Sequence, residues 1–264
     1  MNNIARVLCA LCIGESCWRK QVASSCPLST QRGPCAIFNA LHRGGLRTSW
    51  IDRLKSSFGP KNADVKQETL DVASIQYSMP TIAADVLTFG IPTQASFEGA
   101  PQFHEDEWCQ IEFLPATSLK ELQAALAEYK IFEQAHRLQY GWSEIFARKL
   151  VRAVLIEGAD AVRKLADLFG TMPINAPVLT TTSRPLGQVE SGFAVRPSSD
   201  VLLYGLADER GISALGTMVH GDDMQLSQAF SRLHSSFGLM LVDWRQQLIL
   251  CSVGADGNFA VWRP

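Results

Sequence analysis

The stretch GLMLVDWRQQLILCSVGADGNFAVWRP (residues 238–264) predicts three short strands joined by two tight turns. Its apolar residues gather in the segments LMLVDW, QQLILCSV and FAVWR, which are rich in strand-forming residues. Between the last two segments, Asp256 and Gly257 form a strong hairpin signal, because glycine readily adopts the backbone conformations of a tight turn. The last segment is therefore expected to be an integral strand of a sheet.

A strand followed by a long amphipathic helix is predicted further upstream. The segment WCQIEFLPA (residues 108–116) alternates in polarity and is rich in strand formers. In residues 118–136, apolar side chains three or four positions apart form one stripe: Leu119, Leu122, Leu126 and Tyr129. Ser118 and Glu121 stand at the spacing of a capping box, which predicts where this helix begins.

The rest of the body alternates between predicted strands and predicted helices. A second helix is expected over residues 159–170 and a third over residues 224–238, each ending at a glycine. Strands are expected at residues 85–93, 141–148, 178–182, 200–207 and 211–220, and loops at residues 97–107 and 183–192. The sequence therefore predicts an α+β protein with mixed or antiparallel sheets, a few flanking helices and a strand-helix-strand plan in each half.

Charge divides the chain into a basic N-terminal segment and an acidic body. Residues 1–78 contain 10 Lys/Arg and 5 Asp/Glu, a net charge of +5, whereas residues 79–264 contain 14 Lys/Arg and 21 Asp/Glu, a net charge of −7. The first segment lacks sustained periodicity, and two explanations fit it: a disordered basic extension, or a true start of translation at Met79. The motif MPINAP then divides the body into two α+β halves, residues 79–172 and 173–264.

The body carries no recognised catalytic, cofactor or metal motif. It contains no G-x-S-x-G elbow, no Walker or Rossmann glycine pattern and no ligand spacing typical of a metal site. We therefore expect a protein that is not an enzyme and has no catalytic residues, no cofactor and no bound metal. The alternative is an enzyme with an uncommon site around His104 or His220, which a pocket joining either histidine to a carboxylate and a nucleophile would favour.

Composition also limits the partners and the compartment. An acidic body does not favour nucleic acid, because phosphate contacts need clustered Lys and Arg. No apolar run approaches the roughly 20 residues of a membrane span, so no membrane partner is expected. The cysteines number seven, and an odd number argues against a complete disulfide framework. Free thiols are typical of a reducing compartment, which favours a cytoplasmic location.

Three stretches of the body together resemble a known group of proteins: EDEWCQIEFLPA (residues 105–116), HRLQYGWSEIFAR (residues 136–148) and LVDWRQQLILCSVGADGNFAVWRP (residues 241–264). They look like the immunity proteins encoded beside bacterial type VI secretion toxins, most of all the group that neutralises nuclease effectors of the restriction-endonuclease-like class. The resemblance covers roughly residues 79–264. It implies a cytoplasmic inhibitor that binds its cognate toxin tightly and protects the producing cell.

Carboxylates on the body are the expected partner-binding groups. A nuclease site is built to meet phosphates, so a protein that presents carboxylates can occupy or block it and gain fast association. The expected residues are Glu105, Asp106, Glu107, Asp222 and Asp223, with Trp108 as an apolar anchor beside the acidic loop. A secretion adaptor or chaperone, which binds an effector without blocking its active site, is a further alternative, and a homodimer is compatible with these functions.

Overall fold

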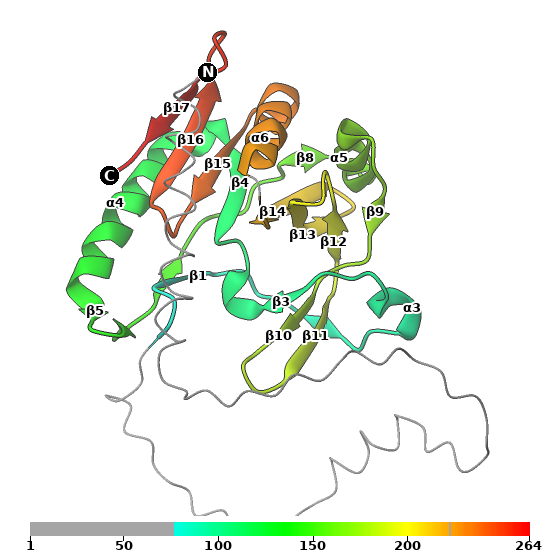
Figure 1. Cartoon of the computed structure of the whole chain (residues 1–264), viewed down its shortest axis with the longest axis horizontal. Coiled ribbons are helices and arrows are strands. Elements are labelled where there is room, and N and C mark those ends of the chain that lie inside the picture. Colours follow the sequence, from blue (N-terminus) through cyan, green and yellow to red (C-terminus); the bar gives the residue numbers. More distant parts are fainter. Residues whose placement is uncertain (1–76, 222) are drawn as a thin grey trace, which may run out of the picture. The chain divides into compact units, whose positions relative to one another are not determined.

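A nine-stranded antiparallel sheet is the centre of this computed structural model, which describes residues 77–221 and 223–264 (Figure 1). The expectations for residues 1–76 and for Asp222 lie outside this range. Eight strands pair in the order β17 (Phe259–Trp262), β16 (Leu248–Val253), β15 (Leu239–Asp243), β4 (Ile111–Pro115), β14 (Gly211–Val219), β13 (Val201–Asp208), β12 (Gly192–Val195) and β9 (Pro173–Ile174). The ninth, β8 (Ile156–Glu157), pairs with the start of β14. The strand β4 therefore lies between strands from much later in the chain.

Both expected halves of the body contribute to this one sheet. Residues 79–172 supply β4 and β8, and residues 173–264 supply the other strands. All described residues belong to one structural unit. The motif MPINAP leads directly into β9, so the chain continues there within the same sheet.

Three smaller sheets surround the large one. A four-stranded sheet pairs β2 (Phe89–Gly90), β11 (Pro185–Val189), β10 (Val178–Thr180) and β3 (Gln102–His104). A parallel pair joins β1 (Thr81–Ala83) to β7 (Phe146–Arg148), and a short hairpin joins β5 (Arg137–Leu138) to β6 (Gly141–Trp142). These small sheets carry segments 81–90 and 141–152 across one face of the large sheet.

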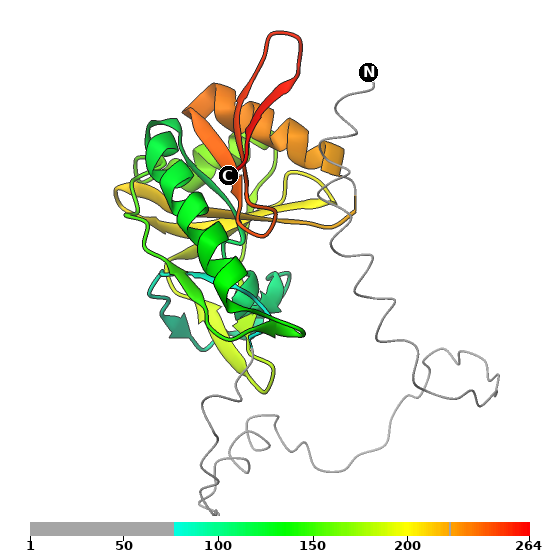
Figure 2. The same cartoon turned by 90° about the vertical axis from the view of Figure 1, so that its left-hand side faces the viewer.

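Helices cover both faces of the nine-stranded sheet. The helices α5 (Ala161–Phe169) and α6 (Asp223–Phe237) pack on one face, α5 against β12 and β14 and α6 against β15 and β16. The helix α4 (Leu119–His136) packs on the opposite face, against Met240 and Val242, and is nearest the viewer in Figure 2. The short helix α3 (Gln94–Phe97) lies in the chain between β2 and β3 of the four-stranded sheet. None of the described helices has the length and apolar character needed to cross a membrane.

The predicted α+β class and the main helices are confirmed. The helix expected over residues 118–136 is α4, and its stripe is buried at Leu122, Leu126 and Tyr129. The helices α5 and α6 end where expected, at Gly170 and Gly238, with φ of 66° and 64°. The sheets are mostly antiparallel, as the hairpin signals indicated.

Two expected loops were wrong, because each contains a strand. Residues 97–107 contain β3, and residues 183–192 contain β11, whose polar and glycine-containing sequence has no strand pattern of its own. β11 forms because it has a partner on each side, β10 and β2. The strand expected at residues 85–93 is only the two residues of β2. Ser118 makes no side-chain cap, because it ends a 3₁₀ turn with φ −87° and ψ 8° instead of the extended conformation of a capping residue.

The edge strand β17 offers a test of the C-terminal packing. Deleting residues 260–264 removes the pairing with β16 and the packing of Val261 and Trp262 against two separate core clusters. We expect a loss of about 3 kcal/mol from the free energy of unfolding, since these side chains are only partly buried. Urea unfolding of the full and shortened chains measures it. Arg263→Ala is the control, and equal midpoints for the deletion and this control would contradict the expectation.

Candidate partner-binding groove

A buried ion-pair network fills the sheet face between α4 and the four-stranded sheet. Its centre is Glu112 of β4, which is fully buried and has Gly216 and Val242 as its neighbours across the sheet. Alternation along β4 turns Ile111 and Phe113 to the opposite face, where they join the core under α5 and α6. The sequence of β4 therefore places a carboxylate in the middle of the molecule, where it requires partners.

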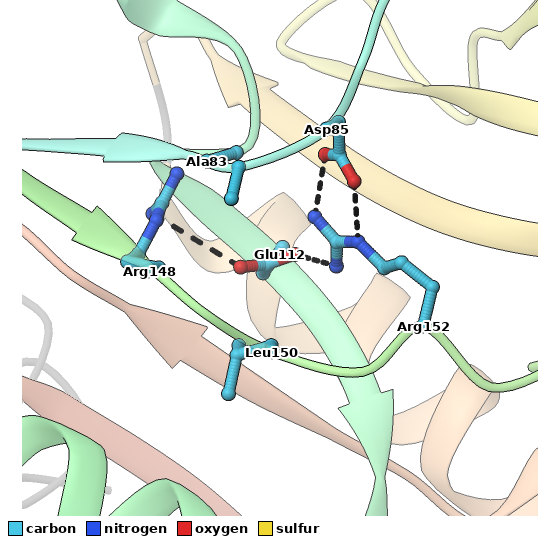
Figure 3. Close-up of a pocket in the computed structure, with 7 residues that line it drawn as sticks. Ala83, Asp85, Glu112, Arg148, Leu150 and Arg152 are labelled. Carbon is cyan, nitrogen blue, oxygen red and sulfur yellow. Dashed lines mark hydrogen bonds and ion pairs between the residues drawn. The ribbon is translucent and has the colours of Figure 1, made fainter.

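Two arginines satisfy this charge, and a second carboxylate, Asp85, shares Arg152 with Glu112 (Figure 3). Arg152 donates from Nε and Nη2 to the two carboxylate oxygens of Asp85, both at 2.7 Å, and from Nη1 to Glu112. Two tryptophan indoles provide further hydrogen bonds to the carboxylates: Trp244 Nε1 donates to Glu112 at 2.7 Å, and Trp108 Nε1 donates to Asp85 at 3.0 Å. The carboxylates thus accept charge-assisted hydrogen bonds in place of water.

Arg148 joins the network to the backbone before β4. Its guanidinium donates to the carbonyls of Cys109 at 2.9 Å and Trp108 at 3.4 Å, and it lies 4.0 Å from Glu112. It also stands over the ring of Trp244, 5.0 Å from the ring centroid. Arg148 ends β7, so these contacts hold β7 against the sheet.

The pKa values follow from burial and pairing. Burial of Asp85 acts to raise its pKa, but the hydrogen bonds and charge of Arg152, with the indole of Trp108, outweigh burial and leave the pKa below its ordinary value. Burial lowers the pKa of Arg148, although Glu112 opposes the shift. For Arg152, burial is outweighed by Glu112 and Asp85, which raise its pKa. The shifts of Asp85 and Arg152 both favour the charged forms, so this ion pair acts as a tether.

The cavity inside this network is too small for a substrate. It has a volume of about 10 Å³ and is lined by Asp85, Glu112, Arg148 and Arg152 with three apolar neighbours (Figure 3). Such a volume is close to the minimum that one water molecule needs.

A much larger groove shares Arg148 and Leu150 with the lining of this cavity. It encloses about 520 Å³ between α4 and residues 145–150. The helix contributes Glu121, Ala124, Ala125, Glu128 and Phe132. Half-buried apolar side chains of both segments contribute to its lining, among them Phe132 and Phe146, whose rings lie 5.3 Å apart. The carboxylates of Glu121 and Glu128 are exposed, so the groove combines apolar and acidic surface.

One wall of the groove carries an unpaired strand edge. Within residues 77–221 and 223–264, β1 is the only strand that pairs with β7. Phe146 N donates to Pro80 O at 2.9 Å, and the parallel register then turns the backbone groups of Phe146 and Arg148 toward β1. The N–H and C=O of Ala147 point the other way, and Ala147 is exposed and lines the groove.

The predicted acidic loop is a 3₁₀ turn whose charges are partly paired. Glu105 is exposed. Glu107 lies 3.3 Å from the guanidinium of Arg245, whereas Asp106 lies 3.3 Å from Nδ1 of His104, which forms an ion pair with it only when the ring is protonated. These three carboxylates are together on the surface, and their negative charge is weaker than the sequence EDE indicates.

Trp108 was expected to be an apolar anchor for a partner, but the structure buries it. Its side chain is only 4% exposed, packs 5.2 Å from the ring of Tyr204 and donates to Asp85. Trp108 is buried because its indole N–H serves the ion-pair network. Asp223 begins α6, as expected of a residue near the helix start, and its side chain lies outside the described part, as does Asp222.

The surroundings of His104 bear on the enzyme alternative. Its Nδ1 accepts a hydrogen bond from Asp106 N at 3.2 Å, and Thr182 Oγ1 lies 3.4 Å from its Nε2. When Nδ1 accepts a hydrogen bond, a neutral ring carries its proton on Nε2. Nε2 then donates to the hydroxyl of Thr182, and it cannot act as a base that takes the proton of this hydroxyl. A hydrolytic triad requires the opposite tautomer. This geometry therefore favours a capping histidine.

The groove and the network were not among the residues singled out from the sequence. The signal for the network was weak: Glu112 interrupts an apolar strand, and Arg148 and Arg152 are four residues apart in a segment of ambiguous pattern. Nothing in the sequence indicated that β7 has only one partner strand within the described part of the chain. No protein family, no curated protein and no solved structure matches the chain, so the groove is interpreted from its own geometry.

The network is tested at its central carboxylate. Glu112→Gln keeps the shape and an acceptor for Trp244 but leaves two buried arginines without this charge. We expect a loss of about 3 kcal/mol in the free energy of unfolding, because removing one partner of a buried pair leaves an uncompensated charge. Glu107→Gln, which breaks the surface pair with Arg245, is the control and is expected to cost less than about 1 kcal/mol. Similar losses for both variants in urea unfolding would contradict a special role for Glu112.

A second buried carboxylate predicts a pH dependence. Asp243 is 2% exposed at the end of β15, and burial raises its pKa to about 6 despite a hydrogen bond of 2.9 Å from Gln246 N. Because the folded pKa is above the unfolded value, the folded state holds the proton more tightly, and its contribution to stability is lost as pH rises from about 4 to about 6. The loss expected from a shift of this size is roughly 3 kcal/mol.

The variant Asp243→Asn isolates this effect. It is expected to match the native protein in stability near pH 4 and to be more stable at pH 7, since the amide stays neutral. Urea unfolding at both pH values gives the difference in unfolding free energy between the variant and the native protein. The titration of the other carboxylates is the same in both proteins and cancels from this difference. An unchanged difference between the two proteins from pH 4 to pH 7 would show that Asp243 titrates normally.

Proposed function

We propose that this protein binds and neutralises another protein, acting as an immunity protein against a secreted bacterial toxin, with a nuclease effector as the favoured target. The observation that carries the proposal is the groove beside α4. Its apolar and acidic lining and its unpaired strand edge are features of a surface that binds a polypeptide. The resemblance of three body segments to type VI immunity proteins is consistent with it.

Charge supports a basic target. The body, residues 79–264, has a net charge of −7. Exposed carboxylates stand on two surfaces: Glu121 and Glu128 in the groove, and Glu105 on the acidic turn. A nuclease presents Lys and Arg to its substrate, so an acidic protein is steered toward that site and can block it.

The proposal is tested by capture and by inhibition together. The full chain, tagged and used as bait at 50 mM salt in a strain that carries an adjacent toxin gene, is expected to capture the toxin in a stable complex. The nuclease activity of the captured toxin is expected to be lost in the complex, and co-expression is expected to protect growth. Absence of a complex at low salt would contradict the proposal, and full toxin activity within the complex would favour a secretion adaptor.

A charge reversal tests the steering. Glu105→Lys is expected to slow association at low salt by about threefold, because exposed charges at the rim of an interface mainly change the association rate. Glu209→Lys, an equally exposed change, is the matched control. Equal association rates for the two variants would remove the acidic turn from the interface and leave the groove as the candidate surface.

A further inference from the structure

We propose that the partner enters the groove as an extended segment, which adds a strand to the free edge of β7 and alternates apolar side chains with lysine or arginine. This inference rests on the proposed function and goes further, because it names the binding mode and the chemistry of the bound segment.

The backbone of β7 supplies the first argument. The N–H and C=O of Ala147 point away from β1, and Ala147 is exposed and lines the groove. A strand edge with unpaired backbone groups is a template for another strand, and main-chain hydrogen bonds then provide affinity that does not depend on sequence. The edge is presented firmly, because Arg148 and Arg152 hold the segment on either side of Leu150 to buried carboxylates.

The dimensions of the groove fit a short strand. Its helical side runs from Glu121 to Phe132, 12 residues, whose Cα atoms span about 16 Å of helix at a rise of 1.5 Å per residue. A strand of about five residues has this length. The side chains of such a strand point alternately to its two faces, so every second residue can meet the half-buried Phe132, Phe146 and Leu150.

The acidic side of the groove predicts the charge of the bound segment. Glu121 and Glu128 are two turns apart on the exposed side of α4 and line the groove. Lys149 is the exposed cation in the lining, whereas Arg148 is buried with Glu112. A segment with lysine or arginine along its length is complementary to the two carboxylates, and an acidic segment is repelled.

The probe for the test is a phage-displayed library of random heptapeptides, selected on the full chain. Selected peptides are expected to alternate apolar residues with Lys or Arg. Ala124→Trp fills the groove from an exposed helical position and is expected to weaken these peptides at least tenfold. Ala127→Trp, exposed on the same helix but outside the groove, is the matched control and is expected to leave affinity within twofold.

Two further measurements separate strand addition from other binding. The amide of Ala147 is expected to exchange with deuterium at least tenfold more slowly when a selected peptide is bound. Replacing both carboxylates, Glu121→Lys with Glu128→Lys, is expected to weaken basic peptides about tenfold, whereas Glu98→Lys with Glu209→Lys is expected to have no effect.

Several outcomes would overturn the inference. The occupant would be excluded if none of the selected peptides bound Ala124→Trp and Ala127→Trp differently. It would also be excluded if the selected peptides were helical or acidic. Slow exchange at Ala147 in the unbound full chain would mean that the chain itself covers the edge, and a dimer broken by Ala124→Trp would mean that a second copy does. If Ala124→Trp captured and inhibited the toxin as well as the native protein does, this inference would be contradicted and the proposed function would stand. If peptides bound specifically in the groove but the protein inhibited no toxin, the inference would stand and the proposed function would be contradicted.

Discussion

The rest of the structure depends on one buried interaction, the charge of Glu112 shared between Arg148 and Arg152. A carboxylate in the middle of a sheet face is costly unless every oxygen has a partner, and here the partners come from segments distant in the sequence. Arg148 and Arg152 follow α4, and Asp85 precedes the four-stranded sheet. The network therefore joins segments that pack on two different hydrophobic clusters: residues 83–89 contribute to one, and Phe146 and Leu150 contribute to the other.

The same network determines what the surface offers. Arg148 and Leu150 line both the small cavity of the network and the groove, so the segment that the arginines hold also forms a wall of the groove. β7 is paired on one edge and open on the other, and the half-buried Phe132 and Phe146 lie beside the open edge. A structural feature, the burial of charge, thereby creates a binding feature, a rigid strand edge with apolar and acidic surroundings. This link between core and surface is the basis of the proposed interaction with a basic polypeptide.

Much of the fold was predictable from local patterns, and the site was not. The stripe of α4, the glycines that end α5 and α6 and the C-terminal hairpin are all signals contained within a few residues. β3 and β11 escaped prediction because each pairs with a strand that is distant in the sequence, β3 with β10 and β11 with β2. Trp108 was expected at the surface because it adjoins EDE, yet its indole is required inside by Asp85, a residue 23 positions earlier. The open edge of β7 depends on which strands do not pair, and no local pattern contains that information.

The coupling between Glu112 and Arg152 is the most direct test of this account. A double-mutant cycle with Glu112→Gln and Arg152→Met, followed by urea unfolding, measures the interaction energy apart from the individual costs. The account predicts a coupling of about 2 kcal/mol or more, because each single variant leaves a buried charge that the double variant does not. Additive losses, with a coupling near zero, would mean that the two side chains act independently and that the network does not hold the groove in place.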